Sequence, residues 1–253
     1  MTQSKKIGWV SVLFVLMFSL HPGIVAASDS TTIPFPGNGY VGVCLHTEIP
    51  VDLMQMIFAI TGQTAMTHCW VTATVNGVQG AIHSDGRIRE DGLNGVHFLC
   101  WSDLLNLCAQ GSIRLFKPNK KAIGYAELEG LGINFYGIPP FFMKLLAHRL
   151  GNLMINIWIQ EMLAYSGVPY DLDFMPSDDE IYCSELLAHG WNNTGSSFEL
   201  FPSQKADTLD GWSTVGPLLE PLGYSITEET DVYNITYILS DEIRPYFKEI
   251  SLD

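Results

Sequence analysis

An Asn-Gly pair at residues 76–77 is the feature that most constrains how this chain folds. The segments on either side, Thr67 to Val75 and Val78 to Ser84, are rich in residues that favour strands. Asn-Gly between such segments favours a two-residue hairpin turn, because both central residues must adopt a positive φ. Val75 then faces Val78, and every pairing further along follows. The sequence therefore predicts an antiparallel hairpin of fixed register.

The predicted register brings two histidines together. Trp70 lies opposite His83, and side chains alternate between the two faces of a strand, so His68 shares the face of Trp70 and His83. Diagonal neighbours are roughly 7–8 Å apart at the backbone, a gap that two imidazoles can close. An alternative is that both histidines are half-buried and have no chemical role. The opposite face suits a core and carries Cys69, Val71, Ala73 and Ile82.

Cys183 begins a short apolar helix that we expect to end near Gly190. The preceding residues 177–180, Ser-Asp-Asp-Glu, offer helix caps. A helix N-terminus and a nearby imidazole both lower the pKa of a thiol, which makes it a nucleophile. We expect His68 to accept the proton of Cys183 and His83 to orient His68. First-turn amides would stabilise an oxyanion. The alternative is an inert, buried helix cysteine.

The first 27 residues have the pattern of a secretory signal. Lys5 and Lys6 precede an apolar run over residues 7–20, and Val25-Ala26-Ala27 offers small residues for cleavage after Ala27. The apolar run is too short to span a membrane comfortably. We therefore expect a signal peptide over 1–27, a loose leader over 28–40 and one domain over 41–253, in a secreted or periplasmic protein.

Charge and motifs exclude several partners. The net charge of −14 repels nucleic acid and anionic membrane surfaces, so a neutral, cationic or apolar substrate is expected. There is no GxGxxG, P-loop or paired-cysteine zinc pattern, and we expect no cofactor and no metal. The apolar helix expected over 141–165 is interrupted by charged residues, so no stable membrane span is expected there.

The chain has five cysteines, an odd number that fits one reactive thiol. If Cys183 stays free, the other four could form up to two disulfides in three possible pairings. The alternative is that several of them are buried, reduced thiols. These four residues are Cys44, Cys69, Cys100 and Cys108.

The remaining expectations concern secondary structure. We expect strands near Val41, over 113–116 and over 233–239. Helices are expected over 51–60, over 101–108 with Ser102 as its cap, and over 141–165. Residues 118–121 are expected to form a turn, residues 85–99 a loop or short strands, and the glycine-rich segment 125–137 has no assignment.

Two segments resemble the permuted papain-like amidases of the YiiX/YaeF type. Residues 166–174, Ser-Gly-Val-Pro-Tyr-Asp-Leu-Asp-Phe, precede residues 181–187, Ile-Tyr-Cys-Ser-Glu-Leu-Leu, in the order and spacing of that family. These amidases belong to the NlpC-type cysteine-peptidase superfamily and are related to lecithin–retinol acyltransferase. The histidine hairpin resembles the family's upstream strands. The resemblance covers about residues 40–190.

The resemblance implies an α+β, circularly permuted papain-like (NlpC-type) fold, with a small antiparallel sheet packed on helices. It implies Cys183 as nucleophile, His68 as base and His83 as the third polar residue. YiiX-type enzymes usually have glutamate at the third position, and histidine there is closer to the acyltransferases. A family glycine is replaced by Trp70. We expect Trp70, Tyr170 and Tyr182 to contact substrate.

The sequence thus predicts a cysteine hydrolase that cleaves an amide or ester bond through a thioester on Cys183. The substrate would be small and amide-, ester- or peptide-like, including one with an acyl or lipid portion. One alternative is an acyltransferase that passes the acyl group to an alcohol or amine. The other is a secreted binding module with an inactive site.

Overall fold

The structure is a computed structural model that describes residues 33–45, 66, 68–86, 94–109, 111–133, 136–171, 179–208, 212–219 and 226–252. The chain divides into two units, Met1–Pro34 and Phe35–Asp253. The signal peptide predicted over 1–27 and the helix predicted over 51–60 lie outside the described residues. No helix in the described ranges is both long and apolar enough for a transmembrane span.

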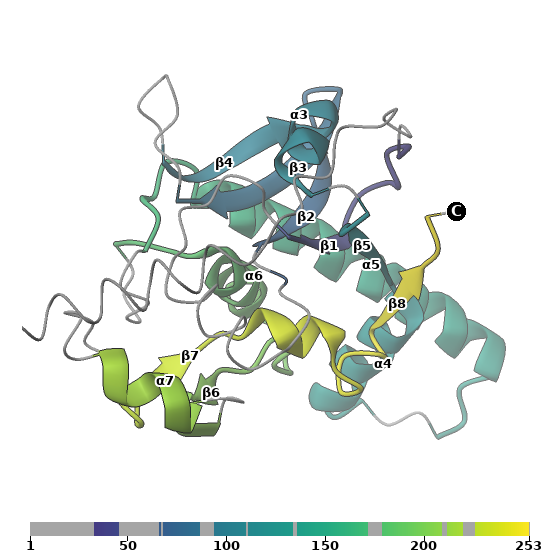
Figure 1. Cartoon of the computed structure of the whole chain (residues 1–253). Helices are drawn as coiled ribbons and strands as arrows, with labels where there is room; N and C mark the ends of the chain where they lie inside the picture. Colours follow the sequence, from purple (N-terminus) through teal and green to yellow (C-terminus); the bar gives the residue numbers. More distant parts are fainter. Residues whose placement is uncertain are drawn as a thin grey trace, which may run out of the picture. The chain divides into compact units, whose positions relative to one another are not determined.

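A six-stranded antiparallel sheet forms the centre of the larger unit (Figure 1). Its order is β4 (Gly95–Cys100), β3 (Val78–Asp85), β2 (His68–Val75), β1 (Val41–Cys44), β5 (Arg114–Pro118) and β8 (Phe247–Ile250). A separate two-stranded ribbon joins β6 (Gln204–Lys205) to β7 (Asp231–Val232). β4 occupies one edge of the sheet and lies next to the histidine hairpin.

The predicted hairpin is confirmed together with its register. Val75 pairs with Val78, and the turn residues Asn76 and Gly77 have φ values of 52° and 81°. The positive φ values are those that a two-residue hairpin turn requires. Residues 85–99 do not form a loop throughout, because β4 pairs with β3 and places His97 directly across from His83.

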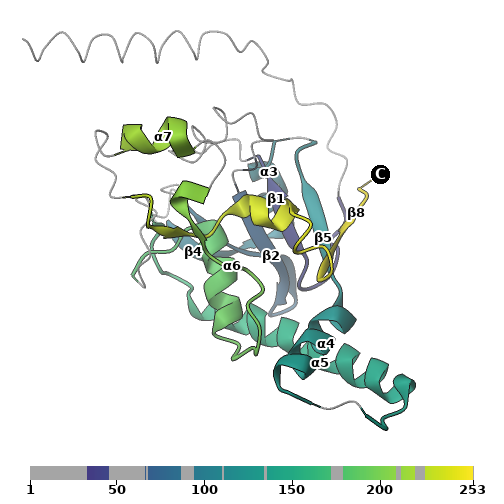
Figure 2. The same cartoon turned by 90° about the horizontal axis from the view of Figure 1, so that it is seen from below.

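The helices of this unit are α3 (Trp101–Leu107), α4 (Lys120–Gly130), α5 (Pro140–Ala164), α6 (Cys183–Asn192) and α7 (Trp212–Leu219), with 3₁₀ turns η1 (Ala206–Thr208) and η3 (Ile235–Leu239). Both views show α6 lying beside α5 (Figures 1 and 2). The core joins these two helices to one face of the sheet. Its members include Val41, Val43, Cys69, Val71, Ala73, Ile82, Ile155, Trp158, Leu186 and Trp191.

Two glycines let α4 and α5 approach closely. A Cβ added at Gly124 would meet the backbone of Ala147, and one added at Gly151 would meet the carbonyl of Lys120. Because Gly124 lies opposite Ala147 and Lys120 lies opposite Gly151, the two helices run antiparallel. Figure 2 shows the pair extending away from the sheet.

Only part of α5 is buried. The C-terminal half packs into the core through Ile155 and Trp158. Near the N-terminus, Phe141 is 71 % exposed and Phe142 is 60 % exposed. Met143 and Ala147 of this half pack with Leu128 of α4, so the half buries one side and leaves its other apolar side chains exposed.

Three local predictions were wrong. Ser102 does not cap α3, whose N-cap residue is Cys100. Residues 118–121 are not a turn, because Pro118 ends β5 and the Asn119 side chain accepts a hydrogen bond from the amide of Ala122 at the start of α4. The segment 233–239 forms no strand, because residues 235–239 are the 3₁₀ turn η3, and the last strand is β8.

The predicted leader contributes to the fold at its end. Phe35 is the first residue of the larger unit. The amide of Gly39 donates to the carbonyl of Thr72 at 2.7 Å, and the amide of Tyr40 donates to the Thr72 hydroxyl at 2.9 Å. These bonds fix the backbone that enters β1, so residues 35–40 are held against β2.

Candidate active site

Cys183 is the first residue of α6. Its side chain lies beside His68 and Cys69, the first two residues of β2. Its side chain is buried, with 6 % exposed. The N-cap is Tyr182, whose amide donates to the carboxylate of Glu185 at 3.3 Å. Capping therefore comes from within 182–185, and the acidic residues 179–180 precede the helix instead of capping it. First-turn amides have no intrahelical partner, so Cys183 occupies the positive end of α6.

The surroundings of Cys183 favour its thiolate. Hydrogen bonding from the Cys69 thiol, followed by hydrogen bonding and charge from the His68 imidazole, holds the pKa of Cys183 well below its ordinary value, against the opposing effect of burial. The backbone of Cys69 adds a further hydrogen bond. Burial raises the pKa of Cys69 itself. Cys69 therefore remains a thiol that donates, and Cys183 is the sulfur that carries the negative charge.

The two predicted histidines are in direct contact. Nε2 of His68 lies 2.8 Å from Nδ1 of His83. The chain of rings then continues to a third histidine, because Nε2 of His83 lies 3.0 Å from Nε2 of His97. Nδ1 of His97 lies 2.9 Å from the carbonyl oxygen of Gly95. Three imidazoles thus connect the site of Cys183 to a backbone carbonyl.

The carbonyl of Gly95 determines the tautomer of each of the three hydrogen-bonded histidines when all are neutral. A carbonyl only accepts, so His97 carries its proton on Nδ1 and its Nε2 accepts. His83 must then donate from Nε2, which leaves its Nδ1 to accept from Nε2 of His68. The Nδ1 of His68 is left with a lone pair. A neutral His68 is therefore fixed in the tautomer that accepts a proton from Cys183.

A buried carboxylate lies beside this chain. Asp85 is two residues after His83 on β3, on the same face of the sheet, and its side chain is 1 % exposed. Ligating atoms of His83, Asp85 and His97 all lie within 4.8 Å of one another. The site therefore contains a carboxylate as well as three imidazoles, although the third member of the predicted triad is histidine.

The glycine–proline segment before α6 holds the site together. Gly167 and Val168 exchange backbone hydrogen bonds with Val96 of β4, each at 2.8 Å. The amide of Ile181 donates to the carbonyl of Pro169 at 2.9 Å. The segment that the sequence analysis used as a family motif thus joins the strand of His97 to the start of α6.

A second attachment comes from β3. The Ser84 hydroxyl donates to the carbonyl of Ile181 at 2.5 Å. Ser84 follows His83 directly, and Ile181 lies two residues before Cys183. This bond fixes the end of the histidine strand against the backbone that leads into α6.

The three side chains expected to contact substrate are all buried. Trp70 has no exposed surface, while Tyr170 and Tyr182 are 6 % and 5 % exposed. The Tyr182 hydroxyl accepts a hydrogen bond from the amide of Tyr233 at 2.6 Å. Trp70 lies over Gly42, where any Cβ would meet the indole ring. Their roles in substrate binding stay predictions.

All five cysteines are free thiols in the structure. Cys44 and Cys108 are hydrogen-bonded neighbours, and burial, followed by the hydrogen bond with Cys108, raises the pKa of Cys44. Cys100 is exposed. Cys69 and Cys183 are both buried, and the Cys69 thiol is the hydrogen-bond partner of the Cys183 sulfur.

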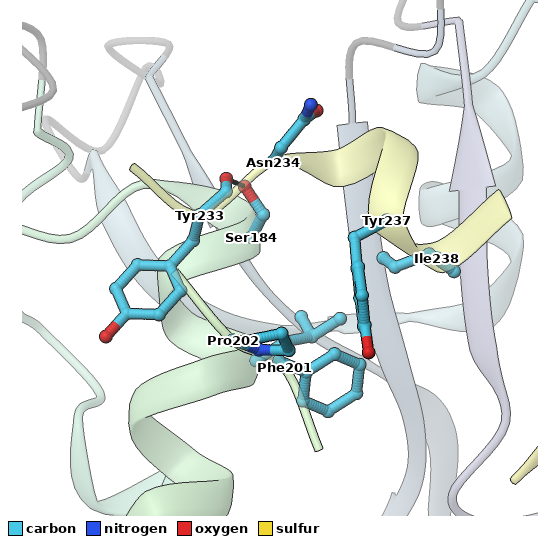
Figure 3. Close-up of a pocket in the computed structure, with 8 residues that line it drawn as sticks. Ser184, Phe201, Pro202, Tyr233, Asn234, Tyr237 and Ile238 are labelled. Atoms are coloured by element: carbon cyan, nitrogen blue, oxygen red, sulfur yellow. Dashed lines mark hydrogen bonds between the residues drawn. The ribbon is translucent and has the colours of Figure 1, made fainter. Parts of the chain in front are cut away.

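A small pocket borders the start of α6 (Figure 3). It has a volume of about 10 Å³, roughly the space of one water molecule, and it is lined by Ser184, Leu187, Phe201, Pro202, Tyr233, Asn234, Tyr237 and Ile238. The Ser184 hydroxyl donates to the carbonyl of Tyr233 at 2.6 Å. Figure 3 shows the Tyr237 ring facing Phe201 and Pro202 while the ring of Tyr233 turns away.

Sequence reasoning found Cys183, His68 and His83 but missed three contributors. Asp85 was detectable, since its spacing from His83 places both on one face of a strand. His97 was not, because the glycine-rich segment before it hid β4. Cys69 was assigned to the core, where it does lie. It also contacts Cys183, because α6 begins beside the first residues of β2.

Comparisons with known proteins identify the fold. No protein-family model matches the chain, and no curated protein matches it either. The crystal structure of the metalloprotein YiiX from Escherichia coli O157:H7, DUF1105, is similar with a TM-score of 0.58 and 17 % identity, over 86 % of this chain and 97 % of that one. At this identity the likeness concerns the fold alone. The predicted α+β fold of the YiiX-like, papain-like type is confirmed.

Proposed function

We propose that this chain is a cysteine hydrolase that cleaves an amide or ester bond through a thioester on Cys183. The observation that carries the proposal is the contact of Cys183 with a histidine whose tautomer is set by a chain of hydrogen bonds. A nucleophile, a base and an orienting group within hydrogen-bonding reach of one another are the parts that covalent acyl transfer requires.

The chemical steps follow from the roles of these residues. The Cys183 thiolate attacks the carbonyl carbon, and amides at the start of α6 face the developing oxyanion. Protonated His68 donates its proton to the leaving nitrogen or oxygen as the carbon–heteroatom bond breaks, which leaves a thioester. His68 then takes a proton from water, the hydroxide attacks the thioester, and the acid departs with the thiolate restored.

The pocket beside α6 has about the room of one water molecule, so it does not by itself accommodate an acyl group. Leu187, Phe201 and Ile238 contribute much of its lining, and its residue Ser184 follows the nucleophile directly. The preference for an acyl or peptidyl substrate therefore comes from the resemblance to the YiiX-type amidases. We therefore favour an acyl or peptidyl amide or ester as substrate, and the signal-like N-terminus supports a secreted or periplasmic location.

A histidine as the third member of the predicted triad favours a second candidate function, transfer of the acyl group to an alcohol or amine. His83 contacts His68 directly, where the YiiX-type amidases usually have glutamate. Hydrolysis and transfer share the thioester and differ only in the acceptor. Release of free acid in the presence and absence of an added alcohol or amine separates them.

A metal ion is a further candidate ligand, since the similar YiiX structure is described as that of a metalloprotein. The residues that fit one here are His83, Asp85 and His97, whose ligating atoms cluster within 4.8 Å. A divalent ion would supply positive charge beside the third member of the triad. The proposed acyl-transfer steps need no such ion.

The test of the proposed function is labelling with a thiol-directed activity probe, followed by mapping of the labelled residue and competition with amides and esters. Cys183 should be labelled, and Cys183→Ala and His68→Ala should both remove turnover of any competing substrate. A matched control is Cys100→Ala, which removes an exposed thiol from the same protein. Full turnover in either site variant would end the proposal.

A further inference from the structure

We propose that His83, Asp85 and His97 form a binding site for a divalent transition-metal ion, with Zn²⁺ as the preferred ion. We further infer that the metal and the catalytic hydrogen-bond chain exclude each other, so that the metal inhibits acyl transfer. The second half rests on the proposed function. The first half concerns metal binding alone.

The geometry of the two histidines suits one shared ion. Nε2 of His83 and Nε2 of His97 face each other at 3.0 Å across paired positions of β3 and β4. Zinc binds histidine nitrogen at about 2.0–2.1 Å, so two nitrogens on one ion stand roughly 3.0–3.4 Å apart. An ion that binds both nitrogens would therefore displace the proton that links the two rings.

Asp85 completes the set from the same face. Its carboxylate has an atom within 4.8 Å of the ligating nitrogens, and its side chain is buried. Its cross-strand partner is Gly95, where the place of a Cβ is occupied by the backbone of Val168 and Pro169. Two imidazoles and one carboxylate, all borne by adjacent strands, form a rigid set of three ligands.

The groups behind the ligands also fit a metal site. Nδ1 of His97 is bound to the carbonyl of Gly95, which leaves the Nε2 lone pair directed at the site. Nδ1 of His83 is bound to the ring of His68. His97 has the usual arrangement of a metal-ligating histidine, whose second nitrogen donates to a fixed acceptor, whereas His83 reaches it only when its hydrogen moves from Nε2 to Nδ1. His97 is half-buried, so an ion has a route from solvent.

The ligand types select the ion. Two imidazoles and one carboxylate suit Zn²⁺ and its neighbours in the first transition row, whereas Mg²⁺ and Ca²⁺ prefer oxygen ligands alone. Three protein ligands leave coordination positions for water, as in open zinc sites. Co²⁺ prefers the same ligands and reports its coordination by visible absorption.

Metal binding reverses the hydrogen-bond chain. A metal on Nε2 of His83 places the proton of that neutral ring on Nδ1, which faces Nε2 of His68 at 2.8 Å. Protonated His68 also carries a hydrogen on Nε2, so two donors would oppose each other. His68 is therefore held neutral with its hydrogen on Nδ1, so it has no lone pair there to accept a proton from water, and losing that hydrogen to the leaving group would leave an imidazolate. The metal should slow amide cleavage most, because an amine leaving group needs that proton.

Binding is tested first, in the Cys183→Ala protein, so that neither activity nor the nucleophile contributes. Titration with Co²⁺ and Zn²⁺, followed by visible absorption and calorimetry, should show one ion per chain without thiolate charge-transfer bands. His97→Ala and Asp85→Asn should each weaken binding at least 10-fold. His148→Ala, an exposed histidine on α5, should change nothing. Unchanged affinity in His97→Ala, or no saturable binding, would overturn the site.

Inhibition is tested next in the wild-type protein with an acyl 4-nitroanilide, with and without Zn²⁺. Added Zn²⁺ should lower turnover at least 10-fold, and EDTA should restore it. If turnover is unaffected while the metal site is occupied, the proposed inhibition is wrong, although the metal site itself still stands. If no amide or ester is cleaved at all, the proposed function fails, whereas the binding titration still decides the site.

Discussion

The thiol of Cys69 donates a hydrogen bond to the sulfur of Cys183, from a strand residue that otherwise belongs to the hydrophobic core. An adjacent donor stabilises a thiolate without adding charge, so it complements the imidazole of His68. The nucleophile therefore has two stabilising partners, of which the sequence analysis identified one. The contributions of Cys69 and His68 to the reactivity of Cys183 can be measured separately.

The reactivity of Cys183 should persist at low pH. Its pKa lies well below the ordinary value, so the thiolate is present where a normal thiol, with a pKa of about 8.5, is protonated. We expect iodoacetamide to modify Cys183 at nearly constant rate from pH 6.5 to 8.5. The rates are measured by mass spectrometry of the peptides, with exposed Cys100 as an internal comparison. A Cys183 rate that rises about tenfold per pH unit would contradict a lowered pKa.

Cys69→Ala should raise the pKa of Cys183, because the main stabilising hydrogen bond is lost while the burial remains. We expect the pH at which the alkylation rate is half-maximal to rise by up to one unit, so that the rate at pH values below this midpoint falls about 3- to 10-fold. Cys69→Ser keeps a donor and should restore most of the rate. If Cys69→Ala alkylates like the wild type, the hydrogen bond contributes nothing to the thiolate.

His97→Ala should impair catalysis without touching the substrate. Nε2 of His83 loses its acceptor, and His68 is no longer restricted to one tautomer. With EDTA present to remove metal effects, we expect kcat to fall roughly 10-fold, less than the 10²–10⁴ that a general base itself contributes. KM should be nearly unchanged. His97→Gln, which retains an acceptor, should recover part of kcat, and a change confined to KM would assign His97 to substrate binding.

The hairpin was predictable because its constraints are local. Asn76 and Gly77 define the turn, the turn defines the register, and the register places His68 beside His83. The position of Cys183 at a helix start also follows from neighbouring residues. These interactions are close along the chain, so alternation and turn chemistry are sufficient to infer them.

The missed features depend on distant segments. β4 has a glycine-rich approach and gains its strand conformation from β3 and from the segment around Val168. Residues 233–239 have strand-forming side chains but form no strand, and residues 235–239 form η3 beside α6, since the Tyr233 carbonyl is taken by the Ser184 hydroxyl. Tertiary hydrogen bonds decided both cases, and local propensity carries no information about them.

His83→Glu tests whether a carboxylate can replace the middle imidazole. A glutamate at this position would accept from Nε2 of His68 and better stabilise its protonated form, although contact with His97 would be lost. We expect kcat within about 10-fold of the wild type, and a larger loss for His83→Ala. Steady-state kinetics of the two variants make the comparison. Equal losses would mean that the interaction with His68 is not the function of His83.

Gly124→Ala should destabilise the protein even though alanine is the better helix former. Propensity alone favours the change by about 0.8–1.0 kcal/mol in a helix interior. Here, however, the added Cβ meets the backbone of Ala147, which cannot move without separating α4 from α5. Overpacking of this kind costs about 1–3 kcal/mol, so the net change in the free energy of unfolding should be a loss. Urea denaturation measures it, with exposed Glu129→Ala on the same helix as the control. A gain in stability would show that the two helices are not in backbone contact at Gly124.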